Sequence, residues 1–194
     1  MHEALLSSQR GWEEYAGAYR TNLVWVGTDS YSPRGAAHVG PQPELIADAK
    51  TDLLEFINHD DLPVVAQCAI AHAQFETIHP FADGNGRCGR ALVHVILRNK
   101  RLSCDTTPPV SAGLLHDTES YFEALTLFRE GDAAPIARQF AQACRFAVIS
   151  GRKLIDDLCE QLDEGRSLLQ GVRSDAAVWR MLPNLIAQPI INTR

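Results

Sequence analysis

The sequence lacks paired cysteines and long apolar runs, and each absence excludes a class of protein. Its five cysteines are odd in number and include no CxxC pair, which argues against a disulfide framework and against a zinc site. No stretch approaches the length of a membrane span. The opening MHEALLSSQRGWEEY has no basic start followed by an apolar run, as a secretory signal would. We therefore expect a cytoplasmic protein with no membrane partner.

An excess of basic charge is also missing. The 194 residues include 24 acidic and 18 basic side chains, a formal net charge of -6, which gives no support for general nucleic-acid binding. With 45% hydrophobic and 22% charged residues the composition is that of an ordinary globular protein. A chain of this length can bury a substantial core, so we expect one well-packed domain.

What the sequence does contain is a dense polar segment, HPFADGNGRCGR, at residues 79–90. Gly84 and Gly86 flank Asn85, and glycine adopts left-handed backbone angles at little cost. The chain can therefore curl its amide N–H groups around an anion at this point. The segment indicates an anion-binding nest.

Two arginines follow the nest at the start of a predicted helix. The apolar residues LV-VIL at 92–97 have helical spacing, which places Arg87 and Arg90 in the first turn. Cations at a helix N-terminus oppose the macrodipole unless something negative lies in front of them. A polyphosphate would supply that charge, and two guanidinium groups three residues apart can grip its oxygens from one face.

Asp83 and His79 complete the segment. The Asp83 carboxylate can hold a magnesium ion that also binds phosphates, since Mg²⁺ commonly takes few protein oxygens. The His79 imidazole suits the removal of a proton from an attacking hydroxyl near neutral pH. A polar loop with ordinary salt bridges is the plain alternative, but it does not explain why all these groups occur together.

The twelve residues resemble the signature of the Fic family, HPFx(D/E)GNGRxxR, and every specified position is filled. The resemblance implies an enzyme that moves AMP from ATP to a protein hydroxyl and releases pyrophosphate. It also implies a role for each matching residue: His79 as general base; Asp83 as magnesium ligand; Gly84, Asn85 and Gly86 as phosphate cradle; Arg87 and Arg90 as ligands of the distal phosphates.

A β-hairpin is predicted upstream, over about residues 23–40. A strand-like run LVWV and a returning AHV enclose the turn-rich GTDSYSPRG. The hairpin resembles the Fic flap, which in the family lies over the active site and pairs with an extended piece of target protein. A hairpin that only covers the core is the alternative. The residues expected to dock a target are Val24, Trp25, Val26, Ala37, His38 and Val39.

The rest of the chain reads as helices, which indicates an all-α fold, a Fic-type helical bundle with the hairpin as a flap over the active site. Helices are expected over 3–19, 43–58, 63–78, from Asp117 or Thr118 to Gly131, and from Pro135 to about 162. Val148 and Ile155 are expected in the core of the last one. The apolar positions of the helix over 63–78 indicate burial on more than one side, as in a central helix. We assign residues 1–165 to a Fic domain and 166–194 to a helical extension. From Ser174 that extension is expected to form one short helix followed by QPIINTR, and it resembles the start of a truncated winged-helix domain. A helix packed on the core is the alternative.

His72 lies seven residues before His79, so a metal pair is conceivable, but a core histidine fits the apolar pattern better. Many Fic proteins also resemble one another in an inhibitory motif, (S/T)xxxE(G/N), whose glutamate opposes the second arginine. Here Thr126 to Gly131 matches it literally, but within a helix end where Glu and Gly are common, so we interpret the match as coincidence. The chain is then freely active, inhibited by a separate partner, or a shortened form of a longer protein.

The leading functional hypothesis is protein AMPylation, with Mg²⁺ as cofactor, ATP as co-substrate and a Tyr, Thr or Ser hydroxyl of a target protein as acceptor. A phosphotransferase of the Doc type is the related alternative, although that branch departs from the intact GNGR found here. An inactive nucleotide-binding regulatory module is the alternative from another class. It would not require His79.

Overall fold

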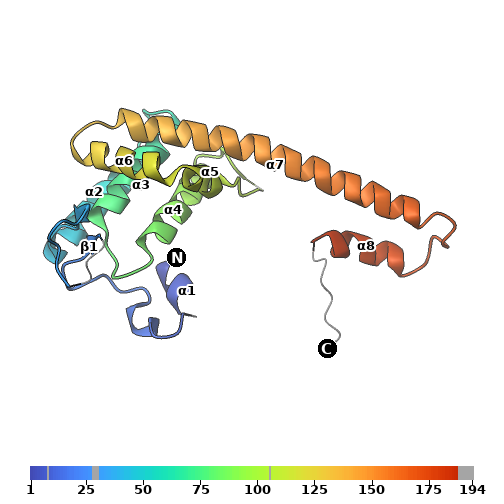
Figure 1. The fold of residues 1–194 in the computed structure, drawn as a ribbon, viewed down its shortest axis with the longest axis horizontal. Coiled ribbons are helices and arrows are strands. Elements are labelled where there is room, and N and C mark those ends of the chain that lie inside the picture. Colours follow the sequence, from blue (N-terminus) through green and yellow to red (C-terminus); the bar gives the residue numbers. More distant parts are fainter. Residues whose placement is uncertain (8, 28–30, 105, 188–194) are drawn as a thin grey trace. The chain divides into compact units, whose positions relative to one another are not determined.

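The computed structural model describes residues 1–7, 9–27, 31–104 and 106–187 (Figure 1). Contacts divide the chain into two compact units, Met1–Ala147 and Val148–Arg194. The segment at 79–90 lies in the first unit. None of the described helices combines the length and the apolar character needed to cross a bilayer.

Helix α3 (Val64–Ile78) is central to the first unit, as its apolar pattern predicted. It packs most extensively against α4 (Asn85–Asn99) and next against α2 (Ile46–Asn58). Ala69, Ala71 and Ala73 are fully buried, and such small side chains let neighbouring helices come close. Because α3 is buried on several sides, its C-terminal end, where the chain turns into α4, is held firmly.

Three further helices complete this core. Helix α5 (Val110–His116) was not expected from the sequence, whereas α6 (Thr118–Arg129) was. Asp117, one of the two residues predicted to begin α6, caps it by accepting a hydrogen bond from the Ser120 amide (3.1 Å). Helix α7 (Ala134–Leu168) contributes Ile136 and Phe140, both fully buried. The expected burial of Val148 and Ile155 is wrong, because each is 59% exposed.

The expected helix over residues 3–19 is also wrong. The segment forms a short α1 (His2–Leu6) and one 3₁₀ turn, η1 (Glu13–Tyr15). Gly11 and Gly17 adopt φ angles of +86° and +81°, left-handed values that end a right-handed helix. Instead of running as a rod, the segment folds back so that His2 reaches the loop between α3 and α4.

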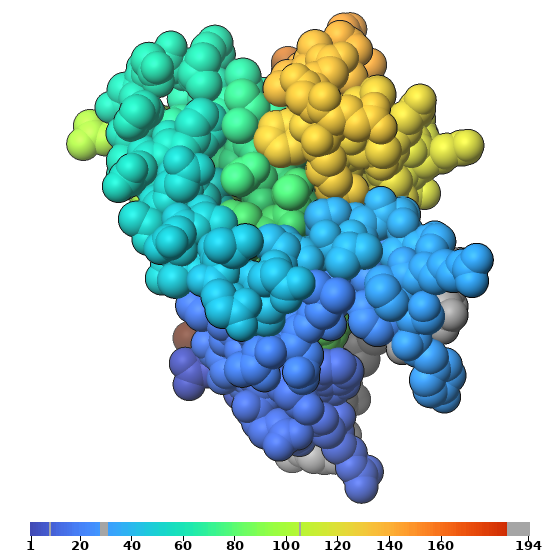
Figure 2. All heavy atoms as spheres, turned by 90° about the vertical axis from the view of Figure 1, so that its left-hand side faces the viewer, coloured from blue at the N-terminus to red at the C-terminus, as the bar shows by residue number. Residues whose placement is uncertain are grey.

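The predicted hairpin is confirmed, with shorter strands. Strand β1 (Trp25–Val26) pairs antiparallel with β2 (His38–Val39), Trp25 opposite Val39 and Val26 opposite His38. Further backbone bonds, Ala37 N–H to Val26 and Gly40 N–H to Val24, extend the pairing. Figure 2 shows the flap in light blue on the surface, next to the dark blue N-terminal segment. A 3₁₀ turn, η2 (Pro43–Leu45), then leads into α2, as Pro43 predicted.

The second unit contains the end of α7 and the helix α8 (Val178–Ala187). Helix α8 is the short helix expected after residue 174, and it includes Pro183. The final QPIINTR, residues 188–194, lies outside the described residues. The start of a winged-helix domain therefore stays a prediction.

Candidate active site

His79 stands where α3 ends, in a backbone conformation unusual for a side-chain-bearing residue. Its φ of 48° and ψ of 60° are left-handed, and such angles persist only where the surroundings impose them. Nδ1 donates to the carbonyl of Glu76 (3.3 Å), one turn back on the same helix. Because a carbonyl only accepts, this contact places the imidazole proton on Nδ1 and leaves Nε2 as a proton acceptor.

The electrostatics keep that acceptor neutral. Burial lowers the pKa of His79 from 6.5 to about 4, and the positive charges of Arg20 and Arg129 act in the same direction. At neutral pH the imidazole is therefore unprotonated and able to take a proton. The protein contributes both requirements of a general base, an oriented ring and a free lone pair.

The loop after His79 is closed by Asn85 rather than by a double glycine nest. The Phe81 amide donates to Asn85 Oδ1 (2.9 Å), and Asn85 Nδ2 donates back to the Phe81 carbonyl (2.8 Å). Gly84 has the expected left-handed φ of +78°, but Gly86 is helical. The side-chain amide of Asn85 is thus committed to shaping the loop. What it leaves for an anion are the backbone N–H groups.

Helix α4 begins at Asn85, two residues earlier than predicted. Its first N–H groups, at Asn85, Gly86 and Arg87, have no intrahelical carbonyl to bond and form the positive end of a helix dipole. Arg90 accordingly lies in the second turn and not in the first. A Cβ added at Gly86 would meet Arg90 Nη1 at 3.1 Å, so this guanidinium folds back over the helix start.

Arg87 and Asp83 form an ion pair, with Nη2 and Oδ2 2.9 Å apart. Arg87 also donates to the side chain of Gln9 (3.1 Å), and the ring of His2 bonds the Asp83 carbonyl. The N-terminal segment therefore supports the loop that bears the acidic residue. Both charged groups of the pair are partly exposed, so the pair is weak and can open when an anion or cation arrives.

An open cleft of about 490 Å³ brings these groups together. The loop after His79 and the first turns of α4 form one wall, and strand β1 of the flap forms the other. Of the predicted residues, the flap residues Val24, Ala37, His38 and Val39 do not line the cleft. Those that do are Trp25, Val26, His79, Asp83, Gly84, Asn85, Gly86, Arg87 and Arg90.

His38 acts from outside the cleft. Its Nε2 donates to the Thr77 carbonyl (2.9 Å), and its ring meets that of His79 edge-on, with centroids 6.4 Å apart. Burial lowers the pKa of His38 as well. This residue therefore ties β2 to the end of α3.

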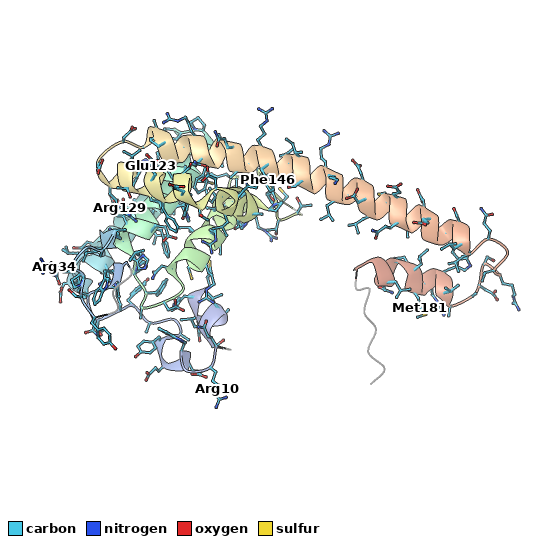
Figure 3. All side chains as sticks on the ribbon, in the orientation of Figure 1. Arg10, Arg34, Glu123, Arg129, Phe146 and Met181 are labelled. Atoms are coloured by element: carbon cyan, nitrogen blue, oxygen red, sulfur yellow. The ribbon has the colours of Figure 1, made fainter. Side chains whose placement is uncertain are left out.

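A buried carboxyl group beside His79 was missed in the sequence analysis. Glu76 is 7% exposed, and its Oε2 lies 4.0 Å from His79 Nδ1. Burial raises the pKa of this carboxyl to about 7, although Arg90 and Arg129 oppose the shift. The spacing of Glu76 and His79, three residues on one helix, was a signal available in the sequence. No comparable spacing in the sequence pointed to Arg129, which is labelled at the end of α6 in Figure 3.

His72 is a core histidine, as expected. Its side chain is fully buried, Nε2 lies 2.7 Å from the Tyr121 hydroxyl, and its ring packs near that of Phe140. Gly89 of α4 packs directly against His72 and Glu76. A Cβ at Gly89 would lie 3.1 Å from His72 Nδ1 and 2.6 Å from Glu76 Oε1. The glycine thus permits the close approach of α3 and α4.

The literal match to the inhibitory motif ends a helix, as predicted. Glu130 is the exposed C-terminal cap of α6, and Gly131 follows with a φ of +102°. Left-handed glycine in this position is a common way to terminate a helix.

The donor set of the cleft fits magnesium. Among the described residues no three His, Cys, Asp or Glu side chains gather as a metal cage, and Asp83 is the acidic residue among those that line the cleft. Mg²⁺ commonly takes one or two carboxylates and completes its shell with phosphate oxygens and water. The Asp83 carboxylate, next to a helix N-terminus that could bind phosphate, would suit such a site.

Comparison with known proteins decides the family. A model of the Fic/DOC family matches residues 1–97, which is half of the chain and includes the flap and the whole polar segment. The chain belongs to the Fic/DOC family. The resemblance read from the signature is thereby confirmed.

The architecture in space is also similar to that of a solved Fic protein. A solved Fic family protein from Desulfovibrio desulfuricans G20 is similar with a TM-score of 0.67 and 27% sequence identity, over 95% of this chain and 56% of that one. The expected all-α bundle with a two-stranded flap is confirmed.

Curated relatives are named protein adenylyltransferases. The one from Caenorhabditis briggsae, fic-1, is 29% identical over 145 residues, 73% of this chain and 25% of the relative. Those from Nematostella vectensis and Drosophila mojavensis are 32% and 31% identical, over 66% and 89% of this chain and 27% and 31% of theirs. The chain thus spans about a quarter to a third of the length of these relatives.

Proposed function

We propose that this Fic chain is a protein adenylyltransferase that moves AMP from Mg-ATP to a Tyr, Thr or Ser hydroxyl of a target protein. The observation that carries the proposal is the cleft, in which an oriented, neutral imidazole faces the open N-terminus of α4 and two arginines. The names of the relatives support the same activity.

Different residues of the cleft bind the phosphates and transfer the proton. The N–H groups at the start of α4, with Arg87 and Arg90, hold the phosphates of ATP. Nε2 of His79 takes the proton of the target hydroxyl, whose oxygen forms a bond to the α-phosphorus. The bond from that phosphorus to the bridging oxygen breaks, and pyrophosphate leaves. A magnesium ion held by Asp83, when bound, neutralises phosphate charge.

The flap supplies the means of holding a target. Val26 is 38% exposed and lines the cleft, so an extended segment that paired with β1 would pass close to His79. Main-chain pairing of this kind gives affinity without demanding a particular side chain. Cytoplasmic location and control by a separate inhibitory partner also belong to the proposal.

Labelled nucleotides distinguish the candidate reactions. The protein is incubated with Mg²⁺ and a cell lysate, once with ATP labelled at the α-phosphate and once with ATP labelled at the γ-phosphate. AMP transfer puts only the α-label on protein, and mass spectrometry finds an AMP adduct on a hydroxyl side chain. Transfer of the γ-label alone, above that in the same lysate without the protein, would favour the Doc-type phosphotransferase. Nucleotide binding with neither label transferred would favour an inactive regulatory module.

A further inference from the structure

Arg20 is a buried arginine outside the signature, and its donors all go to backbone carbonyls. The residue is 5% exposed, yet no carboxylate among the described residues lies within ion-pair distance of it. Nε donates to His79 (2.7 Å), Nη2 to Pro41 (2.6 Å) and Ile78 (3.3 Å), and Nη1 to Asn22 (3.0 Å). An arginine is seldom buried without a partner charge, so this arrangement needs a reason.

The carbonyls come from two separate parts of the site. Those of Ile78 and His79 end α3, where unpaired carbonyls and the negative end of the helix dipole favour a cation. Those of Asn22 and Pro41 stand at the two bases of the flap. The backbone N–H of Arg20 adds a bond to the Pro80 carbonyl (3.0 Å). One guanidinium therefore joins both ends of the flap to the residue proposed as the base.

Gly40 lies directly against the Arg20 guanidinium. A Cβ added at this buried glycine would lie 2.8 Å from Arg20 Nη2. The φ of Gly40 is not left-handed, so space rather than backbone freedom accounts for the absence of a side chain. A side chain at position 40 would compete with the guanidinium for the same space.

We propose that Arg20 is the positioning residue that couples the flap to His79 and sets the distance between a flap-bound hydroxyl and the imidazole. This inference rests on the proposed adenylyl transfer. Arg20 bonds the His79 carbonyl directly and so helps to hold the left-handed backbone that aims the ring. Small displacements between reacting groups cost large factors in rate, whereas the phosphate-binding residues 83–90 receive no bond from Arg20.

The test separates positioning from folding and from nucleotide binding. Arg20→Gln, Arg20→Lys, Gly40→Ala and the control Arg10→Gln are compared with the wild type; Arg10 is exposed and points away from the rest of the N-terminal segment (Figure 3). Calorimetry with Mg-ATP gives the Kd and the number of sites, which counts folded molecules. Initial rates of α-label transfer to lysate proteins, taken at several ATP concentrations, give kcat and KM.

We expect Arg20→Gln to lower kcat about 100-fold while the Kd, the KM for ATP and the number of sites stay within about twofold. Arg20→Lys and Gly40→Ala should fall between this variant and the wild type, and Arg10→Gln should match the wild type. A folded Arg20→Gln protein with wild-type kcat overturns the inference, as does a loss of rate that only follows a loss of sites. If Arg20→Gln does not fold, wild-type kcat in folded Gly40→Ala overturns it. An inactive wild type would instead contradict the proposed function itself.

Discussion

Replacing Glu76 with glutamine tests the electrostatics beneath the proposed base. Burial raises the pKa of this carboxyl from 4.5 to about 7, against the pull of Arg90 and Arg129. The folded state thus holds a proton on Glu76 at pH values where the unfolded state has lost it. The stability that Glu76 contributes is fully present below about pH 4.5 and is lost as the pH rises through about 7.

The size of the effect follows from the two pKa values. The change from 4.5 to about 7 corresponds to about 3 kcal/mol in total, most of which falls between pH 5 and pH 8. Glutamine stays neutral at every pH and has nearly the same shape. The free energy of unfolding of the wild type, relative to Glu76→Gln, should therefore fall by about 2–3 kcal/mol between those two pH values.

Urea unfolding of both proteins at the two pH values measures this difference. The other ionisable groups are present in both proteins, so their contributions cancel to a first approximation. Glu123→Gln, at an exposed position on α6 labelled in Figure 3, is the matched control and should change by less than about 0.5 kcal/mol. A difference that does not vary with pH, or that varies in the opposite direction, would refute the reasoning. It would mean that burial does not raise the pKa of the Glu76 carboxyl.

Three other experiments have definite expected results. Gly89→Ala places a methyl group 2.6 Å from the Glu76 carboxyl and should lower the free energy of unfolding, measured by urea titration, by about 1–3 kcal/mol. The control Gly151→Ala, where an added Cβ meets nothing within 4 Å, should not lower it. In proton NMR of the nucleotide-free protein the His79 imidazole should titrate near pH 4, so the contribution of His79 to stability should be lost as the pH drops from 6.5 toward 4, opposite in sign to that of Glu76. A midpoint near 6.5 would show that burial does not control the pKa of His79. Glu130→Gly should leave α-label transfer within about twofold of the wild type, because Glu130 is an exposed helix cap, and strong activation would identify it as an inhibitory residue.

The parts of the site that the sequence predicted are those that depend on local spacing. Residues 79–90 are contiguous, so their order alone brings the loop and the start of α4 together. The long apolar pattern of α3 likewise predicted its central place. Even here the local hydrogen bonds shifted the details, because the Asn85 side chain closes the loop and starts the helix earlier than the glycines suggested.

The parts that it did not predict depend on contacts between distant segments. The carbonyls that Arg20 bonds at the end of α3 lie more than fifty residues away in sequence, and Arg129 reaches the surroundings of Glu76 from another helix. Neither contact has a spacing that periodicity can detect. Helical periodicity also gave Val148 and Ile155 an apolar face, but a pattern does not tell whether a helix has a neighbour to pack on.

The most direct test of the account is α-label transfer by His79→Ala beside the wild type. The wild type should label protein from Mg-ATP. The variant should lose at least about 100-fold in rate, because the base is gone, while its Kd for Mg-ATP stays within about twofold, because the phosphate-binding residues remain. Transfer that survives the substitution at the wild-type rate would contradict the assignment of His79 as the base.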